Sequence, residues 1–115
     1  MLFALVIAII PGAVAAANAQ VGMNFPREAK HLAVYAPPPE YPYEARAKRL
    51  MGRAEVWLNV NPLTGRVSSV RLVQSTGYKI LDDAALRMSW KWRFKPGAVS
   101  HVRMPINFTM QGVQH

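Results

Sequence analysis

The chain has 115 residues, no cysteine, and 14 Lys and Arg against 6 Asp and Glu, which gives a formal net charge of +8. This length allows a single domain, and the lack of cysteine excludes a disulfide framework and a thiolate metal site. The excess charge favours an anionic partner or a solvated basic face, whereas the spread of basic residues from Arg27 to Arg103 excludes a polybasic tail.

The first 19 residues are an apolar leader. Residues 1–17 carry no charged side chain, and a Pro11-Gly12 break leaves the run short for a membrane span. Ala17-Asn18-Ala19 has the small-x-small pattern of a signal-peptidase site, with cleavage before Gln20. We expect residues 1–19 to be a signal peptide that exports the domain, with an uncleaved membrane anchor as the alternative.

A tether and a short helix are expected next. Residues 20–37 show no clean periodicity and lead into a stiff proline run, so we expect a flexible tether there. Pro42 suits the first position of a helix, Glu44 follows in the first turn, and Gly52 provides a stop. The residues at helical spacing that predict its apolar face are Tyr43, Ala47, Leu50 and Met51.

A β-hairpin follows the helix. Apolar and polar residues alternate from Ala54 to Asn61, as in a strand with one buried face. Residues 61–65 form a turn cluster, and residues 67–75 form the return strand. Two serines between Val67 and Val70 interrupt the alternation, which is typical of a β-bulge.

A second helix is expected over residues 79–92. Asp82 and Asp83 lie in its first turns and basic residues near its end, as the helix dipole favours, so both acids are interpreted as surface residues. Lys95-Pro96-Gly97 terminates the helix. The stripe expected to be buried consists of Leu81, Ala85, Met88 and Trp92.

The last strand is the clearest element of the sequence. Its apolar row consists of Val102, Met104, Ile106, Phe108 and Met110, and the residues between them are mostly polar. Pro105 cannot donate a ladder hydrogen bond and is tolerated on an edge strand but hardly in a central one. We therefore expect an α+β fold: a small antiparallel sheet of about three strands, ending in an edge strand, with two helices on one face in the order helix–strand–strand–helix–strand.

Five segments, in this order and spacing, resemble the C-terminal domain of TonB energy transducers. They are Tyr41-Pro42-Tyr43-Glu44-Ala45 with Gly52; Val60-Asn61-Pro62-Leu63-Thr64-Gly65-Arg66-Val67; Ser75-Thr76-Gly77 with Leu81-Asp82-Asp83-Ala84-Ala85-Leu86; Trp92-Arg93-Phe94-Lys95-Pro96; and Met104-Pro105-Ile106-Asn107-Phe108. The resemblance implies a periplasmic TonB C-terminal-like domain over residues 38–111, which the leader could also tether to the inner membrane.

The resemblance also implies a partner and a binding site. In this family a segment of an outer-membrane transport receptor, the TonB box, adds as a strand beside the last strand of the domain, and an exposed strand edge supplies the backbone groups that such addition needs. The implied peptide-binding strand consists of His101, Val102, Arg103, Met104, Pro105, Ile106, Asn107, Phe108 and Thr109, with a weaker secondary contact at Pro38, Pro39 and Glu40.

The chain departs from a full transducer in two respects. About 17 residues, from Gln20 to Ala36, separate leader and domain, and fully extended they reach only about 60 Å. The family's anchor carries a histidine that couples to the inner-membrane motor proteins, and residues 1–19 contain none. We therefore expect a stand-alone or shortened member of the family.

Catalytic, metal and cofactor sites are not expected. His31, His101 and His115 are far apart in the sequence, and no glycine-rich phosphate loop occurs. Ser75 and Ser89 have no base at motif spacing. The sequence therefore predicts a binding domain and not an enzyme.

Three partners other than a receptor are considered: nucleic acid, an envelope polymer and a second copy of the chain. Aromatic residues among basic ones can stack on nucleic-acid bases, but Trp92 and Phe94 are better explained as core, and export argues against nucleic acid. Trp57 is the exception, because it projects from the polar face of its strand. The alternatives to receptor binding are a module for peptidoglycan or another envelope polymer, and a strand-exchanged homodimer.

Overall fold

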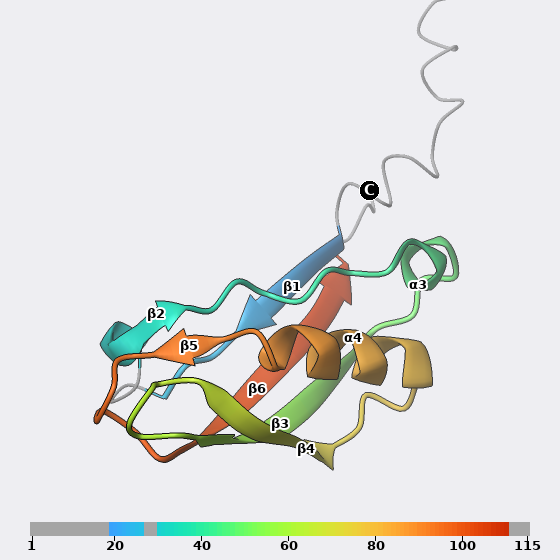
Figure 1. The fold of residues 1–115 in the computed structure, drawn as a ribbon. Helices are drawn as coiled ribbons and strands as arrows, with labels where there is room; N and C mark the ends of the chain where they lie inside the picture. The colour runs from blue at the N-terminus through green and yellow to red at the C-terminus, as the bar shows by residue number, and fades with distance from the viewer. Residues whose placement is uncertain (1–18, 27–29, 111–115) are drawn as a thin grey trace, which may run out of the picture.

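The computed structural model describes residues 19–26 and 30–110, and the rest of the predicted leader lies outside them. A four-stranded antiparallel sheet has the order β1-β6-β3-β4, and a two-stranded sheet joins β2 and β5 (Figure 1). The elements are β1 (Ala19–Met23), the 3-10 turn η1 (Lys30–Leu32), β2 (Ala33–Tyr35), α3 (Tyr43–Ala47), β3 (Gly52–Val60), β4 (Val67–Gln74), α4 (Lys79–Ser89), β5 (Arg93–Phe94) and β6 (His101–Met110). Within these ranges no helix is long and apolar enough to cross a membrane.

The hairpin of β3 and β4 follows the sequence prediction. The apolar row of β3, Ala54, Val56, Leu58 and Val60, is buried. In the register of the two strands, Val60 pairs with Val67 and Asn59 with Ser69, so Ser68 is an extra residue in β4. This confirms the bulge expected at the serine pair.

Helix α4 packs on one face of the sheet, against β3 and β4, but it is shorter than predicted (Figure 1). It ends at Ser89, and after Trp90 the N–H groups of Lys91 and Trp92 donate to carbonyls three residues back, those of Met88 and Ser89. This tighter turn directs Trp92 into the core, where it is 1% exposed and donates from Nε1 to the Pro37 carbonyl at 2.8 Å. Burial of Trp92 was predicted correctly, but its place on the helix was wrong.

The short helix α3 buries a different face from the predicted one. Ala45 is fully buried, whereas Tyr43 is 73% exposed and Met51 is 48% exposed. The helix ends at Ala47, and Arg49, two residues later, has a positive φ of 56° that allows the Leu50 N–H to donate to the Ala45 carbonyl.

Gly52, expected to stop the helix, instead begins β3. A Cβ at this position would lie 2.7 Å from the Thr76 carbonyl oxygen, so glycine is required there by the close approach of two backbones.

Asp82 is a buried turn acceptor and not the surface acid that was predicted. It is 9% exposed and accepts hydrogen bonds from the Thr76 N–H (2.8 Å), the Thr76 hydroxyl (2.7 Å) and the Ser75 hydroxyl (2.5 Å). Burial acts to raise the pKa of Asp82, but these hydrogen bonds and the charge of Lys79 outweigh it and hold the pKa below its ordinary value. Asp83 is more exposed and pairs with Lys79 at 2.9 Å.

The sheet differs from the prediction at its edge. The expectation of about three strands with the last at the edge is wrong, because β1 pairs antiparallel with β6 along its outer side. Residues 20–37, expected to form a tether, contain most of β1 and all of β2. The physical reason is the alternation in β1: its half-buried residues Ala19, Val21 and Met23 extend the apolar face of the sheet.

Candidate functional site

Strand β6 presents two rows of side chains to two different environments. Val102, Met104, Ile106 and Phe108 are at most 4% exposed and face the core. The residues between them point to the opposite face of the sheet: His101, Arg103, Pro105, Asn107 and Thr109. The nine predicted site residues therefore divide into a core row and an open-face row, and what they share is the backbone of one strand.

The two sides of the β6 backbone can be assigned from two hydrogen bonds. The Val60 N–H donates to the Ser100 carbonyl at 2.8 Å, and the Asn24 N–H donates to the Pro105 carbonyl at 3.2 Å. The backbone groups of a strand alternate between its two neighbours. The N–H and C=O groups of even-numbered residues of β6 therefore point to β3. The N–H and C=O groups of odd-numbered residues point to the outer side of β6, which is the side of β1.

This assignment explains why the strand tolerates Pro105. Its missing N–H lies on the outer side of β6, so the ladder to β3 loses nothing. Pro105 thus marks the outer side as the one without a complete ladder. The sequence argument from Pro105 placed this strand at the edge of the sheet, which is wrong, because β1 pairs with its outer side.

The outer side of β6 is only partly covered. β1 pairs with it from Ala19 opposite Met110 to Met23 opposite Ile106, and Asn24 adds the bond to Pro105. Within the described ranges, no strand pairs with the outer side of residues 101–104. These four residues form a free strand edge next to an occupied one.

An aromatic and cationic cluster lies on the open face beside the free edge. The rings of Trp57 and His101 stack at 5.0 Å with an interplanar angle of 9°, and the Arg103 guanidinium lies 5.8 Å from the Trp57 ring centroid. Arg103 Nε also lies 3.5 Å from Glu55 Oε2. Trp57 therefore projects from the face opposite α4, as its sequence pattern predicted, and it packs against two residues of the candidate site.

The predicted secondary contact belongs to the other face of the sheet. Pro38, Pro39 and Glu40 lie in the extended segment that leads to α3 on the α4 side (Figure 1). Pro39 is buried, and Glu40 lines a shallow cavity of about 200 Å³ together with residues of α4. The segment is fixed by Tyr41, whose ring packs edge-on against Phe108 at 5.3 Å. The structure therefore does not bring these residues to the outer side of β6.

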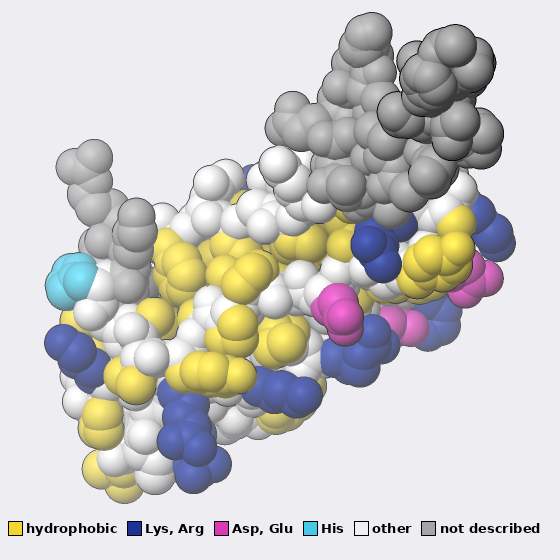
Figure 2. Space-filling view, turned by 90° about the horizontal axis from the view of Figure 1, so that it is seen from above, with side chains coloured by type: hydrophobic (Ala, Val, Ile, Leu, Met, Phe, Trp, Pro, Cys, Tyr) yellow, Lys and Arg dark blue, Asp and Glu magenta, His cyan; other side chains and the backbone are white. Residues whose placement is uncertain are grey.

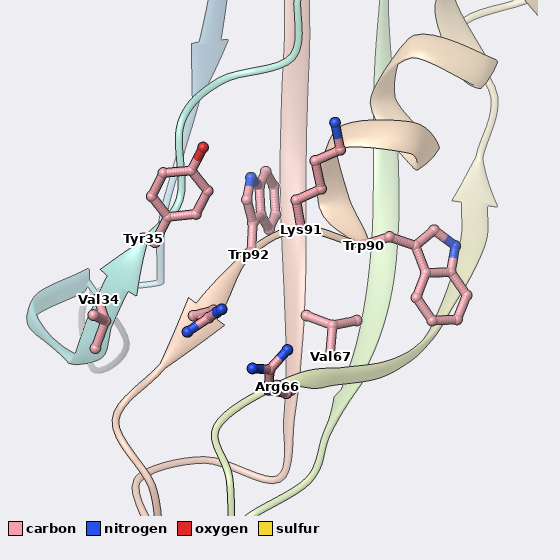
Figure 3. A pocket seen from close by; sticks show the side chains of 8 residues that line it. Val34, Tyr35, Arg66, Val67, Trp90, Lys91 and Trp92 are labelled. Carbon is pink, nitrogen blue, oxygen red and sulfur yellow. The ribbon is translucent and has the colours of Figure 1, made fainter.

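A second hollow, which the sequence analysis did not find, lies where β2, β5 and the ends of α4 and β4 meet (Figure 3). Its volume is about 680 Å³, and it is lined by Val34, Tyr35, Arg66, Val67, Trp90, Lys91, Trp92 and Arg93. Figure 2, the view from above, shows hydrophobic side chains gathered across the middle of the molecule with Lys and Arg side chains beside them. No acidic residue lines the hollow, and no sequence signal pointed to it because β2 and β5 pair across more than fifty residues.

Comparison with known proteins agrees with the fold. Residues 37–110 match the family model described as "Gram-negative bacterial TonB protein C-terminal". The fold is similar to the solution NMR structure of the Pseudomonas aeruginosa TonB C-terminal domain, with a TM-score of 0.58 and 22% identity over 72% of this chain and 88% of that chain. No curated protein matches.

The chain belongs to the TonB C-terminal family, as the resemblance of its five segments indicated. This is a family of non-enzymatic transducer domains, which typically are periplasmic. Membership implies a role in TonB-dependent energy transduction and interaction with TonB-dependent outer-membrane receptors. The matched residues include β3, β4, α4 and β6, whereas β1 and β2 lie outside them.

Proposed function

We propose that this chain binds TonB-box segments of outer-membrane receptors by β-strand addition along the outer side of β6. The observation that carries the proposal is the free outer edge of residues 101–104, continuous with the Pro105 position where the ladder is incomplete. An unpaired strand edge supplies main-chain donors and acceptors for an extended peptide. The expected location is the periplasm, with residues 1–19 as a signal peptide or as an inner-membrane tether.

Backbone pairing supplies the affinity in this mode of recognition, and neighbouring side chains supply selectivity. His101 and Arg103 lie on the open face beside the free edge, where they are held by Trp57. Together with Glu55, which lies 3.5 Å from Arg103, they make this edge polar and aromatic. A receptor segment with a polar or aromatic residue on that face is therefore favoured.

A backbone-directed variant with a matched control tests the proposal. Arg103→Pro removes an outward-facing N–H and leaves the ladder to β3 intact, whereas Arg103→Ala removes the side chain alone. We expect Arg103→Pro to weaken binding of a labelled TonB-box peptide at least about tenfold, since it leaves an acceptor of the peptide unpaired. We expect Arg103→Ala to weaken binding only a few-fold. Equal binding by the wild type and both variants would contradict strand addition at this edge.

The hollow near β2 and β5 favours a second candidate function, a binding module for peptidoglycan or another envelope polymer. Tyr35 and Trp90 are about half exposed there, at 51% and 50%, and aromatic rings of this kind pack on apolar faces of a ligand. Among the described residues, Arg66, Lys91 and Arg93 form no ion pair and are available to a carboxylate. Co-sedimentation with peptidoglycan that falls in Lys91→Glu but not in Arg103→Pro would support this candidate.

A further inference from the structure

The outer side of β6 already carries a strand that belongs to this chain. β1 pairs with residues 106–110, and the Asn24 N–H donates to the Pro105 carbonyl at 3.2 Å. Six consecutive positions of β6, from Pro105 to Met110, therefore have a backbone neighbour on the side proposed for receptor peptides. The candidate site is half occupied from within the molecule.

The side chains of β1 have the alternation of an added strand. Val21 lies opposite Phe108 and Met23 opposite Ile106, and both are half-buried against the core, whereas Gln20 and Gly22 are exposed. Just beyond the strand, the Phe25 ring packs on the Trp92 ring with centroids 6.4 Å apart. β1 is thus docked by backbone pairing together with a short row of apolar contacts.

The side chains of β1 are less buried than those of β3, a strand within the part of the chain that matches the family. Its residues are at best half-buried, whereas alternate residues of β3 are fully buried. The family match begins at residue 37, so β1 is an addition outside the part that defines the family. A strand with these properties can leave while the rest of the sheet stays folded, because local opening free energies are lowest where little apolar surface is buried.

We propose that β1 is an intramolecular competitor for the outer side of β6, displaced when a receptor segment binds. The proposal rests on the proposed function and adds its regulation. A peptide first pairs with the free edge at residues 101–104 and then replaces β1 along residues 105–110. The β1 sequence also describes what this part of the edge accepts: an extended segment with apolar residues at alternate positions on the core-facing side.

A docked β1 has two consequences. The apparent peptide affinity is the intrinsic affinity multiplied by the fraction of molecules in which β1 is undocked, so a β1 docked in about nine of ten molecules weakens binding about tenfold. A docked β1 also shortens the exposed edge of a ten-residue strand, and such edges otherwise promote self-pairing.

Gly22 offers a matched pair of variants in the full-length chain. It lies two residues before Asn24 and therefore has its N–H directed at β6, opposite Asn107. Gly22→Pro removes this donor and undocks β1. Gly22→Ala is the control, since a Cβ there meets nothing within 4 Å and the residue has no positive φ. We expect Gly22→Pro to bind a labelled TonB-box peptide about tenfold more tightly than the wild type, with Gly22→Ala unchanged.

A covalent lock tests the opposite direction. Gly22→Cys combined with Asn107→Cys places two thiols on directly opposed residues in a chain that has no other cysteine. The spacing of opposed antiparallel residues suits a disulfide. We expect the oxidised variant to lose most of its peptide binding and to recover it on reduction.

The outcomes of these experiments distinguish failure of the β1 competitor from failure of the proposed receptor binding. If the wild type, Gly22→Pro and the oxidised lock bind the peptide equally, the competitor is overturned while receptor binding stands. If neither Gly22→Pro nor the reduced lock binds the peptide, both proposals are overturned. If Gly22→Pro dimerises in light scattering and gains no peptide affinity, the natural occupant of the edge is a second copy of this chain, which also overturns the competitor.

Discussion

The two sides of β6 differ in how completely they are paired. Its inner side pairs with β3 over eight positions, from Phe108 opposite Gly52 to His101 opposite Asn59. Its outer side pairs with β1 over five positions and carries a proline that cannot donate. The inner side is part of a closed core, whereas the outer side has a free end and a weakly buried occupant. One strand therefore serves as structure on one side and as an exchangeable surface on the other.

The largest difference in stability is expected between a proline whose missing N–H would point to β3 and one whose missing N–H would point to the outer side of β6. Met104 faces β3 and Arg103 faces outward, so Met104→Pro breaks a central ladder while Arg103→Pro does not. We expect Met104→Pro to abolish cooperative thermal unfolding, and Arg103→Pro to stay within about 1 kcal/mol of the wild type. Met104→Ala controls for the buried side chain and is expected to cost about 2–5 kcal/mol while keeping the fold.

Truncation of opposed apolar residues gives the next largest contrast. Phe108 is fully buried against Tyr41, and its partner Val21 on β1 is half-buried. We expect Phe108→Ala to lower the free energy of unfolding by about 3–5 kcal/mol. We expect Val21→Ala to lower it by about 1 kcal/mol. Urea denaturation measures both, and equal costs would contradict a shallowly docked β1.

The dependence of stability on pH tests the contribution of Asp82, which is buried and lies away from the outer side of β6. The pKa of Asp82 lies below its ordinary value of 3.8, so its contribution to stability is complete above about pH 4 and is lost as pH falls through the lowered value. We expect Asp82→Asn to lower stability by about 1–3 kcal/mol at pH 7 and to flatten the acid limb of the stability curve. An unchanged acid limb in Asp82→Asn would show that another group controls it.

The smallest effect is expected on the open face. His101 is exposed and stacks on Trp57 at 5.0 Å, and a contact of this kind contributes about 0.5–1.5 kcal/mol. We expect His101→Ala to change Trp57 fluorescence and to alter peptide affinity less than about threefold, because the backbone carries the binding. If His101→Ala lost more peptide affinity than Arg103→Pro, side chains and not the backbone would dominate recognition.

How far the sequence predicts this molecule depends on the length and spacing of its signals. The alternation in β3 and β6 is long and regular, so these strands, their buried rows and the bulge at Ser68 could be predicted. The edge could not, because β1 is five residues long and joins β6 across about ninety residues of sequence. The pattern of Ala19, Val21 and Met23 was present, but it adjoins a small-x-small motif that suggested the end of a leader.

Local chemistry misled the prediction at three other positions. The α3 helix is followed by a left-handed arginine, Arg49, although a glycine three residues after this arginine gave a conventional stop signal. Asp82 resembles a surface acid in sequence, and only the fold brings Ser75 and Thr76 around its carboxylate. Trp92 has helical spacing but enters the core from beyond the helix. For Asp82 and Trp92 the contact that determines the outcome comes from outside the helix, from Ser75 and Thr76 in one case and from the Pro37 carbonyl in the other.

The most direct test is an NMR titration of the wild-type chain with a TonB-box peptide, mapped on backbone amides. We expect the largest shifts from His101 to Thr109, loss of protection at Gln20 and Gly22 as β1 leaves, and little change at Val56 and Leu58 on the inner partner strand. Shifts confined to Tyr35, Trp90, Lys91 and Arg93 would contradict this expectation and would place the binding site in the hollow at the C-terminal end of α4.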